Sequence, residues 1–303
     1  MTTRAPSPTY GGQAVIEGVM MRGVTAMAIA VRRPDGGITS RAETLHGLAT
    51  SRLRTVPLLR GVLVLFETMQ LGMRALTWSA AVAAGAVDTK GESESLAVFD
   101  WLVLIGAFAF GGGVFFVGPV LATAWIDRFV ANGWISVLAE GAIRVALLLG
   151  YIWVIGRKGD IARVFQYHGA EHMTIYAHED GRELSVPAVR RYPKEHPRCG
   201  TSFLLTVALV SIVVFAFAGT EPLWWRFASR LILIPFVAAV SYEAIRFAGF
   251  HQRWPVVRWL FAGNIALQYL TTRPPDDEQI QVAIAALQRC RDEERAAALR
   301  GTS

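Results

Sequence analysis

The sequence predicts a mainly α membrane protein with about four transmembrane helices and a small cytoplasmic N-terminal β-structure. Of its 303 residues, 53% are hydrophobic and only 18% are charged, whereas soluble domains carry about a quarter charged residues. The mean hydropathy is +0.37, and the apolar residues fall into long blocks separated by basic segments. The net charge is +6, but the basic residues are scattered among the apolar blocks and form no stripe. We therefore expect no nucleic-acid partner.

Four apolar blocks are predicted to cross the bilayer, whose core takes about 20 helical residues to span. The first has no charged side chain. The second carries Glu140 and Arg144, which are four residues apart, so the two charges share a helix face and can pair. Pro235 predicts a kink in the fourth. The predicted spans are Trp101–Ile126, Ile135–Ile155, Phe203–Gly219 and Leu231–Ala248.

The basic residues predict the orientation of these spans. Residues 1–100 hold ten Lys and Arg, 156–200 hold eight and 250–303 hold seven. The short loops Asp127–Trp134 and Thr220–Ser229 hold one basic residue each. Because strongly basic segments stay on the cytoplasmic side, we expect a multi-pass protein of the cell membrane with both termini in the cytoplasm. Membrane lipids are then its expected surroundings and partners.

Two further segments are apolar but are not predicted to cross. Gly61–Val87 is long enough, yet an odd number of spans would move one basic region outside. We therefore interpret it as a helix that lies in the interface or packs on the bundle. Trp259–Leu270 is too short to span and is predicted to lie at the surface.

The spans divide the chain into parts that alternate between membrane and cytoplasm. These are a cytoplasmic β-rich region (1–60), an interfacial helix and linker (61–100), the first two transmembrane helices (101–155), a cytoplasmic loop rich in His and Cys (156–200), the last two transmembrane helices (201–249) and a cytoplasmic helical tail (250–303). The polar chemistry is therefore expected on the cytoplasmic side.

The N-terminal region has the pattern of small β-structure. Ala14–Met21, Ala26–Arg33 and Ile38–Leu45 are predicted strands. Pro34–Gly37, with the sequence Pro-Asp-Gly-Gly, is a strong turn signal between the second and the third.

The C-terminal tail is predicted to form a docking helix. Acidic residues follow Pro274 and Pro275 and favour a helix start. One apolar stripe then consists of Ile280, Ala283, Ile284 and Leu287. From Arg289 onward the tail is charged and is predicted to be frayed.

The segment 156–200 holds four of the six histidines and one of the two cysteines. His168 and His172, four apart in a predicted helix, project from one face, as two ligands of one metal ion require. With Glu171 they match H-x-x-E-H, the reversed zinc-protease pattern in which the Glu is the general base. The match is short, and no peptidase fold is predicted around it.

His196 and Cys199, three residues apart at the mouth of the third predicted span, add further soft ligands. Each histidine alone is more often a packing or hydrogen-bonding residue. The four ligand candidates cluster in a chain that has few His and Cys residues, so together they favour a site for a divalent metal, Zn²⁺ or a similar ion.

Two charges interrupt the apolar N-terminal run. An unpaired charge there would be costly, so Glu17 and Arg22 either pair with each other or join Glu67, Arg74 or Glu243 in a structural network. The alternative is that Glu17 binds the metal or orients one of its ligands.

These motifs together resemble the YqhQ-type family of bacterial membrane proteins, which carry the domain of unknown function 1385. The matching stretches are Gly11–Gly23, Tyr167–His172, His196–Phe203, Ser241–Glu243 and Gln268–Arg273. The resemblance implies a metal-dependent enzyme without a settled substrate or reaction. Carried onto this chain, the characteristic residues of the family are Gln13, Glu17, Arg22, His168, Glu171, His172, His196, Arg198, Cys199 and Glu243.

The expected function is that of a metal-dependent membrane hydrolase or transferase with its site at the cytoplasmic interface. His168 and His172, joined by His196 or Cys199, would bind the ion, and Glu171 would be the catalytic base that activates water. A lipid or a membrane peptide would suit such a site as substrate.

The alternative is a non-enzymatic membrane assembly or regulatory protein. Its His/Cys cluster would hold a structural metal or only hydrogen bonds, and a structural metal predicts a closed site with four ligands. A transporter is disfavoured by the small number of predicted spans and by the lack of a visible repeat.

Overall fold

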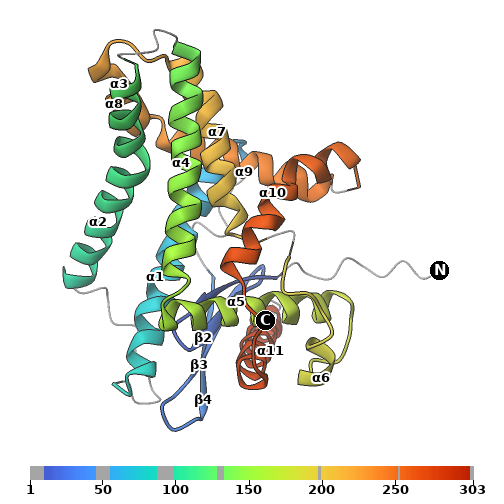
Figure 1. The fold of residues 1–303 in the computed structure, drawn as a ribbon. Helices are drawn as coiled ribbons and strands as arrows, with labels where there is room; N and C mark the ends of the chain where they lie inside the picture. Colours follow the sequence, from blue (N-terminus) through green and yellow to red (C-terminus); the bar gives the residue numbers. More distant parts are fainter. Residues whose placement is uncertain are drawn as a thin grey trace.

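The computed structural model describes residues 10–45, 55–86, 98–127, 133–196, 199–251 and 253–300. These residues are mainly helical, with a small N-terminal sheet below a group of upright apolar helices (Figure 1), as predicted. The strands are β1 (Gly11–Val15), β2 (Gly18–Arg22), β3 (Ala26–Arg32) and β4 (Ile38–Thr44). The helices are α1 (Leu59–Ala83), α2 (Val98–Gly112), the π-helical turn η3 (Gly113–Val117), α3 (Gly118–Ile126), α4 (Gly133–Ile155), α5 (Gly159–Glu179), α6 (Val186–Val189), α7 (Ser202–Ala218), α8 (Leu223–Ile232), α9 (Ile234–Phe250), α10 (Pro255–Thr271) and α11 (Asp277–Arg300).

The sheet is an antiparallel meander in the order β1-β2-β3-β4. The single strand predicted over Ala14–Met21 is wrong, because the chain turns at Ile16 and Glu17 and pairs Val15 with Gly18. Glu17 adopts a positive φ of 50°, as tight hairpin turns require. The turn signal at Pro34–Gly37 is confirmed by the β3–β4 hairpin.

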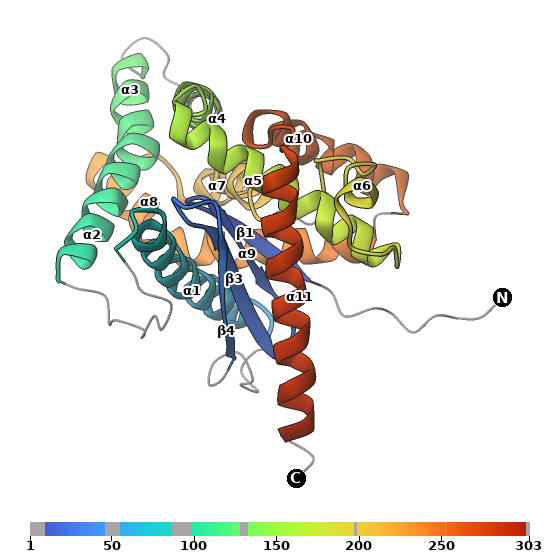
Figure 2. The same cartoon turned by 90° about the horizontal axis from the view of Figure 1, so that it is seen from below.

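Both faces of the sheet are covered, which Figure 2 shows from below. Because side chains alternate between faces along a strand, Val19 and Met21 of β2 pack with α5 and α11, whereas Met20 packs with α1. The sheet thus joins α1 on one side to α5 and α11 on the other. This layered unit holds α5 in place below the upright helices.

The predicted docking helix is confirmed in α11, and its apolar stripe is buried against the sheet and α5. The predicted frayed tail beyond Arg289 is wrong, because the helix continues to Arg300. The carboxylate of Glu294 accepts hydrogen bonds from the Tyr10 hydroxyl at 2.6 Å and from the N–H groups of Val24 and Thr25 at 2.7 and 3.0 Å. These bonds tie the last turns of α11 to the sheet.

Two described helices are long and apolar enough to cross a membrane, namely Ile105–Ile126 and Gly133–Ile155. A third is possible where α8 and α9 form one pair bent by 50°. The bend falls next to Leu233, so the kink expected from Pro235 is confirmed, and α9 starts three residues later than the predicted span. α7 is apolar but has only 17 residues, and the count of four spans stays a prediction.

The two segments that were not predicted to cross form helices packed on the rest of the chain. α1 buries Leu71 and Ala75 against the sheet, and its Gly61 lies directly against Ala239 of α9. α10 buries Leu267 against α4 and α7, while its Trp259 is 77% exposed. The described part of α1 therefore agrees with a helix packed on its neighbours.

A buried charge network joins the upright helices. The predicted pair of Glu140 and Arg144 is confirmed at 2.9 Å. Glu140 also accepts hydrogen bonds from Arg226 at 3.3 Å and from Arg230 at 3.0 Å, and both arginines are only 1% exposed. Arg144 donates in turn to the carbonyl of Phe115 in η3. The network ties α4 to α8 and to the π-helical turn.

Candidate metal centre

α5 presents the two histidines of the H-x-x-E-H motif. It runs across the foot of the upright α4, and the lower end of α10 reaches it from above (Figure 1). Asp160 lies in its first turn, where a negative charge is favourable. His168 and His172 are one helical turn apart and both are buried, so they share the side of α5 that faces the start of α7.

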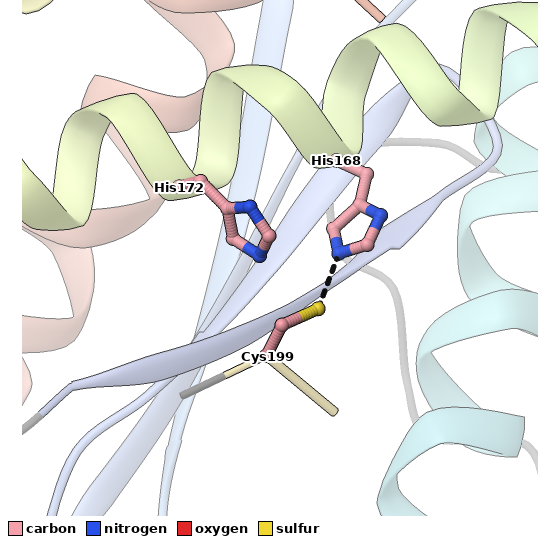
Figure 3. Close-up of side chains that lie close together, drawn as sticks. All are labelled: His168, His172 and Cys199. Atoms are coloured by element: carbon pink, nitrogen blue, oxygen red, sulfur yellow. Dashed lines mark hydrogen bonds between the residues drawn. The ribbon is translucent and has the colours of Figure 1, made fainter. Parts of the chain in front are cut away.

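Cys199, three residues before α7, completes a cluster with these histidines (Figure 3). The Nε2 atom of His168 lies 3.1 Å from the Sγ atom of Cys199. One ligand atom from each of the three side chains lies within 4.8 Å of the others. The exposed fractions are 8% for His168, 1% for His172 and 5% for Cys199, so the cluster is shielded from bulk water.

Backbone carbonyls set the orientation of both imidazole rings. The Nδ1 atom of His168 lies 2.8 Å from the carbonyl oxygen of Thr271, and that of His172 lies 2.6 Å from the carbonyl oxygen of Lys194. Because a carbonyl can only accept, each Nδ1 carries the proton. Each Nε2 therefore keeps a free lone pair, which is the arrangement found around metal-bound histidines.

The donor set fits a zinc ion. Two imidazole nitrogens and one thiolate sulfur are ordinary zinc ligands. Burial lowers the pKa of His172, which favours the neutral imidazole that a metal needs. The residues of the cluster therefore match both the chemistry and the protonation state of a zinc site.

His196 lies beside this cluster and not among its three ligand atoms. Its ring centre is 5.6 Å from that of His172 and 4.5 Å from that of Tyr176. Its Nε2 atom is 3.6 Å from a carboxylate oxygen of Glu179. Burial lowers the pKa of His196 to about 4. Of the four predicted ligands, the structure thus brings together three.

Glu171 is buried next to the sheet, with 4% of its surface exposed. The nearby N–H group of Gly12 favours the charged form of its carboxylate. A Cβ atom at Gly12 would lie 2.8 Å from the Glu171 side chain and 2.7 Å from the carbonyl of Met20, so the close approach requires glycine. Burial raises the pKa of Glu171, and the nearby His168 and His196 oppose that rise.

The other predicted site residues form ion pairs and contacts outside the group of His168, His172 and Cys199. Glu17 binds Arg163 through two hydrogen bonds of 2.5 Å, which sequence reasoning did not anticipate. Arg22 pairs with Glu67 at 2.8 Å, as the structural-network interpretation predicted.

Three predicted residues remain. The amide of Gln13 lies against Gly72 of α1. Glu243 accepts hydrogen bonds from Arg60 and from the N–H group of Leu58. Arg198 lies outside the described residues. Gln13, Glu17, Arg22 and Glu243 are therefore not among the side chains that converge with His168, His172 and Cys199.

Sequence reasoning missed the groups that orient the ligands. Thr271 and Lys194 act through backbone carbonyls, which leave no side-chain pattern in a sequence. Gln268 belongs to a stretch singled out above, but its contact with the segment that carries Cys199 joins residues far apart in the chain.

Fold and site together define a mainly helical protein with helices apolar enough for a membrane and a buried His-His-Cys cluster beside them. The model of the family "Protein of unknown function (DUF1385)" matches residues 56–293. The chain is also 33% identical over 295 residues to the "Uncharacterized protein YqhQ" of Bacillus subtilis (strain 168), covering 94% of this chain and 92% of that protein. The chain belongs to the DUF1385 family. No solved structure matches it.

Proposed function

We propose that this chain is a metal-dependent membrane enzyme, a hydrolase or transferase that binds zinc through His168, His172 and Cys199. The observation that carries the proposal is the convergence of these three side chains, with both Nδ1 atoms held by backbone carbonyls. Metal-binding histidines usually donate their other ring N–H to a carbonyl or carboxylate group, which fixes the orientation of the ring.

The number of ligands favours catalysis over a purely structural ion. Structural zinc sites are closed by four protein ligands, whereas catalytic sites use three and keep one position open. Three side chains form the group among the described residues. Zinc bound there would supply a Lewis acid that polarises a carbonyl or phosphoryl oxygen.

The chain's own residues would orient the reaction and move the proton. Thr271 and Lys194 hold the two imidazoles through their carbonyls. Glu171 adjoins His172 in sequence, and its side chain lies close against Gly12 of β1. We assign Glu171 as the general base, which would take a proton from the attacking nucleophile and return it to the leaving group.

The location favours a substrate that the membrane supplies. α5 crosses the ends of apolar helices (Figure 1). The basic segment 156–200, which contains α5, is predicted to lie on the cytoplasmic side of the membrane. A lipid or a membrane peptide is therefore the proposed substrate class. In this account the chain crosses the cell membrane several times, with both termini in the cytoplasm.

This topology is testable by labelling. Single cysteines introduced at Ser185 and at Gly301 should react with a membrane-impermeant maleimide only after the cell membrane is opened, because both positions are placed in the cytoplasm. The native cysteines are buried, and the unmodified chain gives the background. Labelling of either position in intact cells would contradict the topology.

The general-base role predicts a large loss of activity in Glu171→Gln. The substitution keeps size and one hydrogen-bond acceptor for Gly12 but removes basicity. The loss expected for a missing acid–base group is about 10²–10⁴-fold, with metal content unchanged. Because the substrate is unidentified, activity is measured as complementation of a strain that lacks the gene, under graded expression.

The matched control is Glu179→Gln, two turns further along α5 at a position that is partly exposed. It should complement as the wild type does. Full complementation by Glu171→Gln would exclude the general-base role. Loss of metal together with activity would make Glu171 part of the metal site itself.

The second candidate function is a non-enzymatic one. The 3.1 Å contact between His168 Nε2 and Cys199 Sγ is a satisfactory hydrogen bond without any ion. If the chain is a membrane assembly or regulatory protein with a hydrogen-bonded cluster, its Glu171→Gln variant should complement the deletion strain fully. The purified protein should then hold no stoichiometric metal.

A further inference from the structure

The last turn of α10 contacts the candidate metal centre at His168 and at the backbone of His196. The carbonyl of Thr271 orients His168. One turn earlier, the side chain of Gln268 is completely buried and faces the segment that leads to Cys199. α10 is thus placed to control both the histidine and the cysteine side of the cluster.

Gln268 holds this segment through the backbone of His196. Its Oε1 atom accepts a hydrogen bond from the N–H group of His196 at 2.7 Å, and its Nε2 atom donates to the His196 carbonyl at 2.8 Å. The primary amide therefore pairs with one residue's backbone much as a neighbouring strand would. Buried backbone groups need such partners, and the described residues 193–196 of this segment lie in no helix or strand that could supply them.

The same carbonyl connects Gln268 to Cys199. The N–H group of Cys199 donates to the His196 carbonyl at 3.3 Å, so this oxygen receives hydrogen bonds from both residues. The position of the cysteine backbone then depends on where Gln268 holds His196. A shift of the segment would move the thiol away from the imidazoles.

The start of the segment is tied to α10 as well. The Nζ atom of Lys194 lies 3.3 Å from the hydroxyl oxygen of Thr272 and 5.0 Å from the ring centre of Tyr269. The carbonyl of Lys194 is the group that orients His172. Gln268 therefore sits between the anchor of Lys194 and the ligand Cys199.

We propose that Gln268 is a positioning residue that places the Cys199 sulfur against His168 and His172 and so determines whether the site includes a thiolate ligand. This inference rests on the proposed metal site. It assigns to Gln268 no contact with substrate or metal. Without Gln268, His168 would keep its carbonyl partner on α10, and the sulfur would be the ligand that is lost.

The test uses Co²⁺ as a probe of the site in the full-length protein in detergent. Cobalt bound by a thiolate gives a near-ultraviolet charge-transfer absorption that histidine ligands do not give. Gln268→Leu is expected to lose this absorption, as Cys199→Ser should, and to bind Co²⁺ about 10–100-fold more weakly, the usual effect of removing a group that supports a metal ligand.

Asn264→Leu is the matched control. Asn264 lies one turn earlier on α10, is also buried, and donates from Nδ2 to the Thr206 hydroxyl of α7 at 3.0 Å. Its replacement removes a buried amide from the same helix without touching the Cys199 segment. This variant is expected to keep the thiolate absorption and the wild-type affinity for Co²⁺.

The outcomes separate this inference from the proposed function. Wild type without Co²⁺ binding would overturn the metal site itself. Wild type that binds Co²⁺ while Gln268→Leu keeps the thiolate absorption would overturn the positioning role alone, as would equal losses in Gln268→Leu and Asn264→Leu. If Gln268→Leu does not fold, Gln268→Glu, which keeps only the acceptor for His196, enters the same assay. Failure of both to fold would show a general structural role and contradict the proposal.

Discussion

Glu140→Gln is expected to lower the free energy of unfolding by about 3–5 kcal/mol, the usual effect of breaking a buried ion pair from one side. The carboxylate of Glu140 accepts hydrogen bonds from Arg144, Arg226 and Arg230, and all four side chains are at most 3% exposed. The neutral amide would leave the three buried guanidinium groups with one charge less to balance them.

Asp127→Asn serves as the control for this prediction. Asp127 pairs with Arg226 at 2.6 Å in the same network, but 30% of its side chain is exposed. Water can therefore replace part of the lost interaction, and we expect a change of about 1 kcal/mol or less. The measurement is unfolding of the purified protein in mixed micelles. Equal midpoints for wild type and Glu140→Gln would contradict a structural role for the network.

The sequence was most informative where a regular spacing of side chains indicates a helix and the face on which those side chains lie. The apolar stripe of Ile280, Ala283, Ile284 and Leu287 has the spacing of a helix face, and α11 buries it. The spacing of His168 and His172 likewise put both rings on one side of α5. The uncharged block of Trp101–Ile126 became the continuous run of α2, η3 and α3.

Local patterns were least informative in the sheet, which is buried on both faces. Val19, Met20 and Met21 of β2 are all apolar because α1 covers one face and α5 and α11 cover the other. No alternation of apolar and polar residues therefore marked the turn at Glu17, and two strands were predicted as one.

Long-range pairing explains the remaining differences. Arg226 lies in the short loop before the fourth predicted span and Arg230 directly follows that loop, yet they bind Glu140, 86 and 90 residues away along the chain. Glu294 anchors α11 through the N–H groups of a turn that is 270 residues away in sequence. The residues next to Glu140 and Glu294 in sequence give no sign of these distant partners. For this reason the tail that contains Glu294 was predicted to fray.

The candidate site shows the same division. Side chains that can bind a metal have recognisable types and spacings, so the sequence predicted His168, His172 and Cys199, which the structure brings together in a group that could hold an ion. His196, in contrast, lies beside this group, with its backbone hydrogen-bonded to Gln268 of α10. Only the fold decides which of the two residues enters the ligand group.

The measurement that tests the metal site most directly is X-ray absorption at the zinc edge of the purified protein, which reports both the amount of zinc and its ligands. Wild type should hold about one zinc ion per chain, with one sulfur at about 2.3 Å and imidazole nitrogens at about 2.0–2.1 Å. His172→Ala should lose most of the zinc signal because it removes one of the three ligand side chains that converge on the site.

The control for this measurement is His178→Ala on the same helix, whose ring packs against Tyr10, 5.0 Å between centres, away from the cluster. It should retain the wild-type amount of zinc and the wild-type spectrum. The account predicts zinc with a sulfur neighbour that disappears in His172→Ala and persists in His178→Ala. Wild-type protein without zinc, or zinc whose spectrum lacks sulfur, would contradict it.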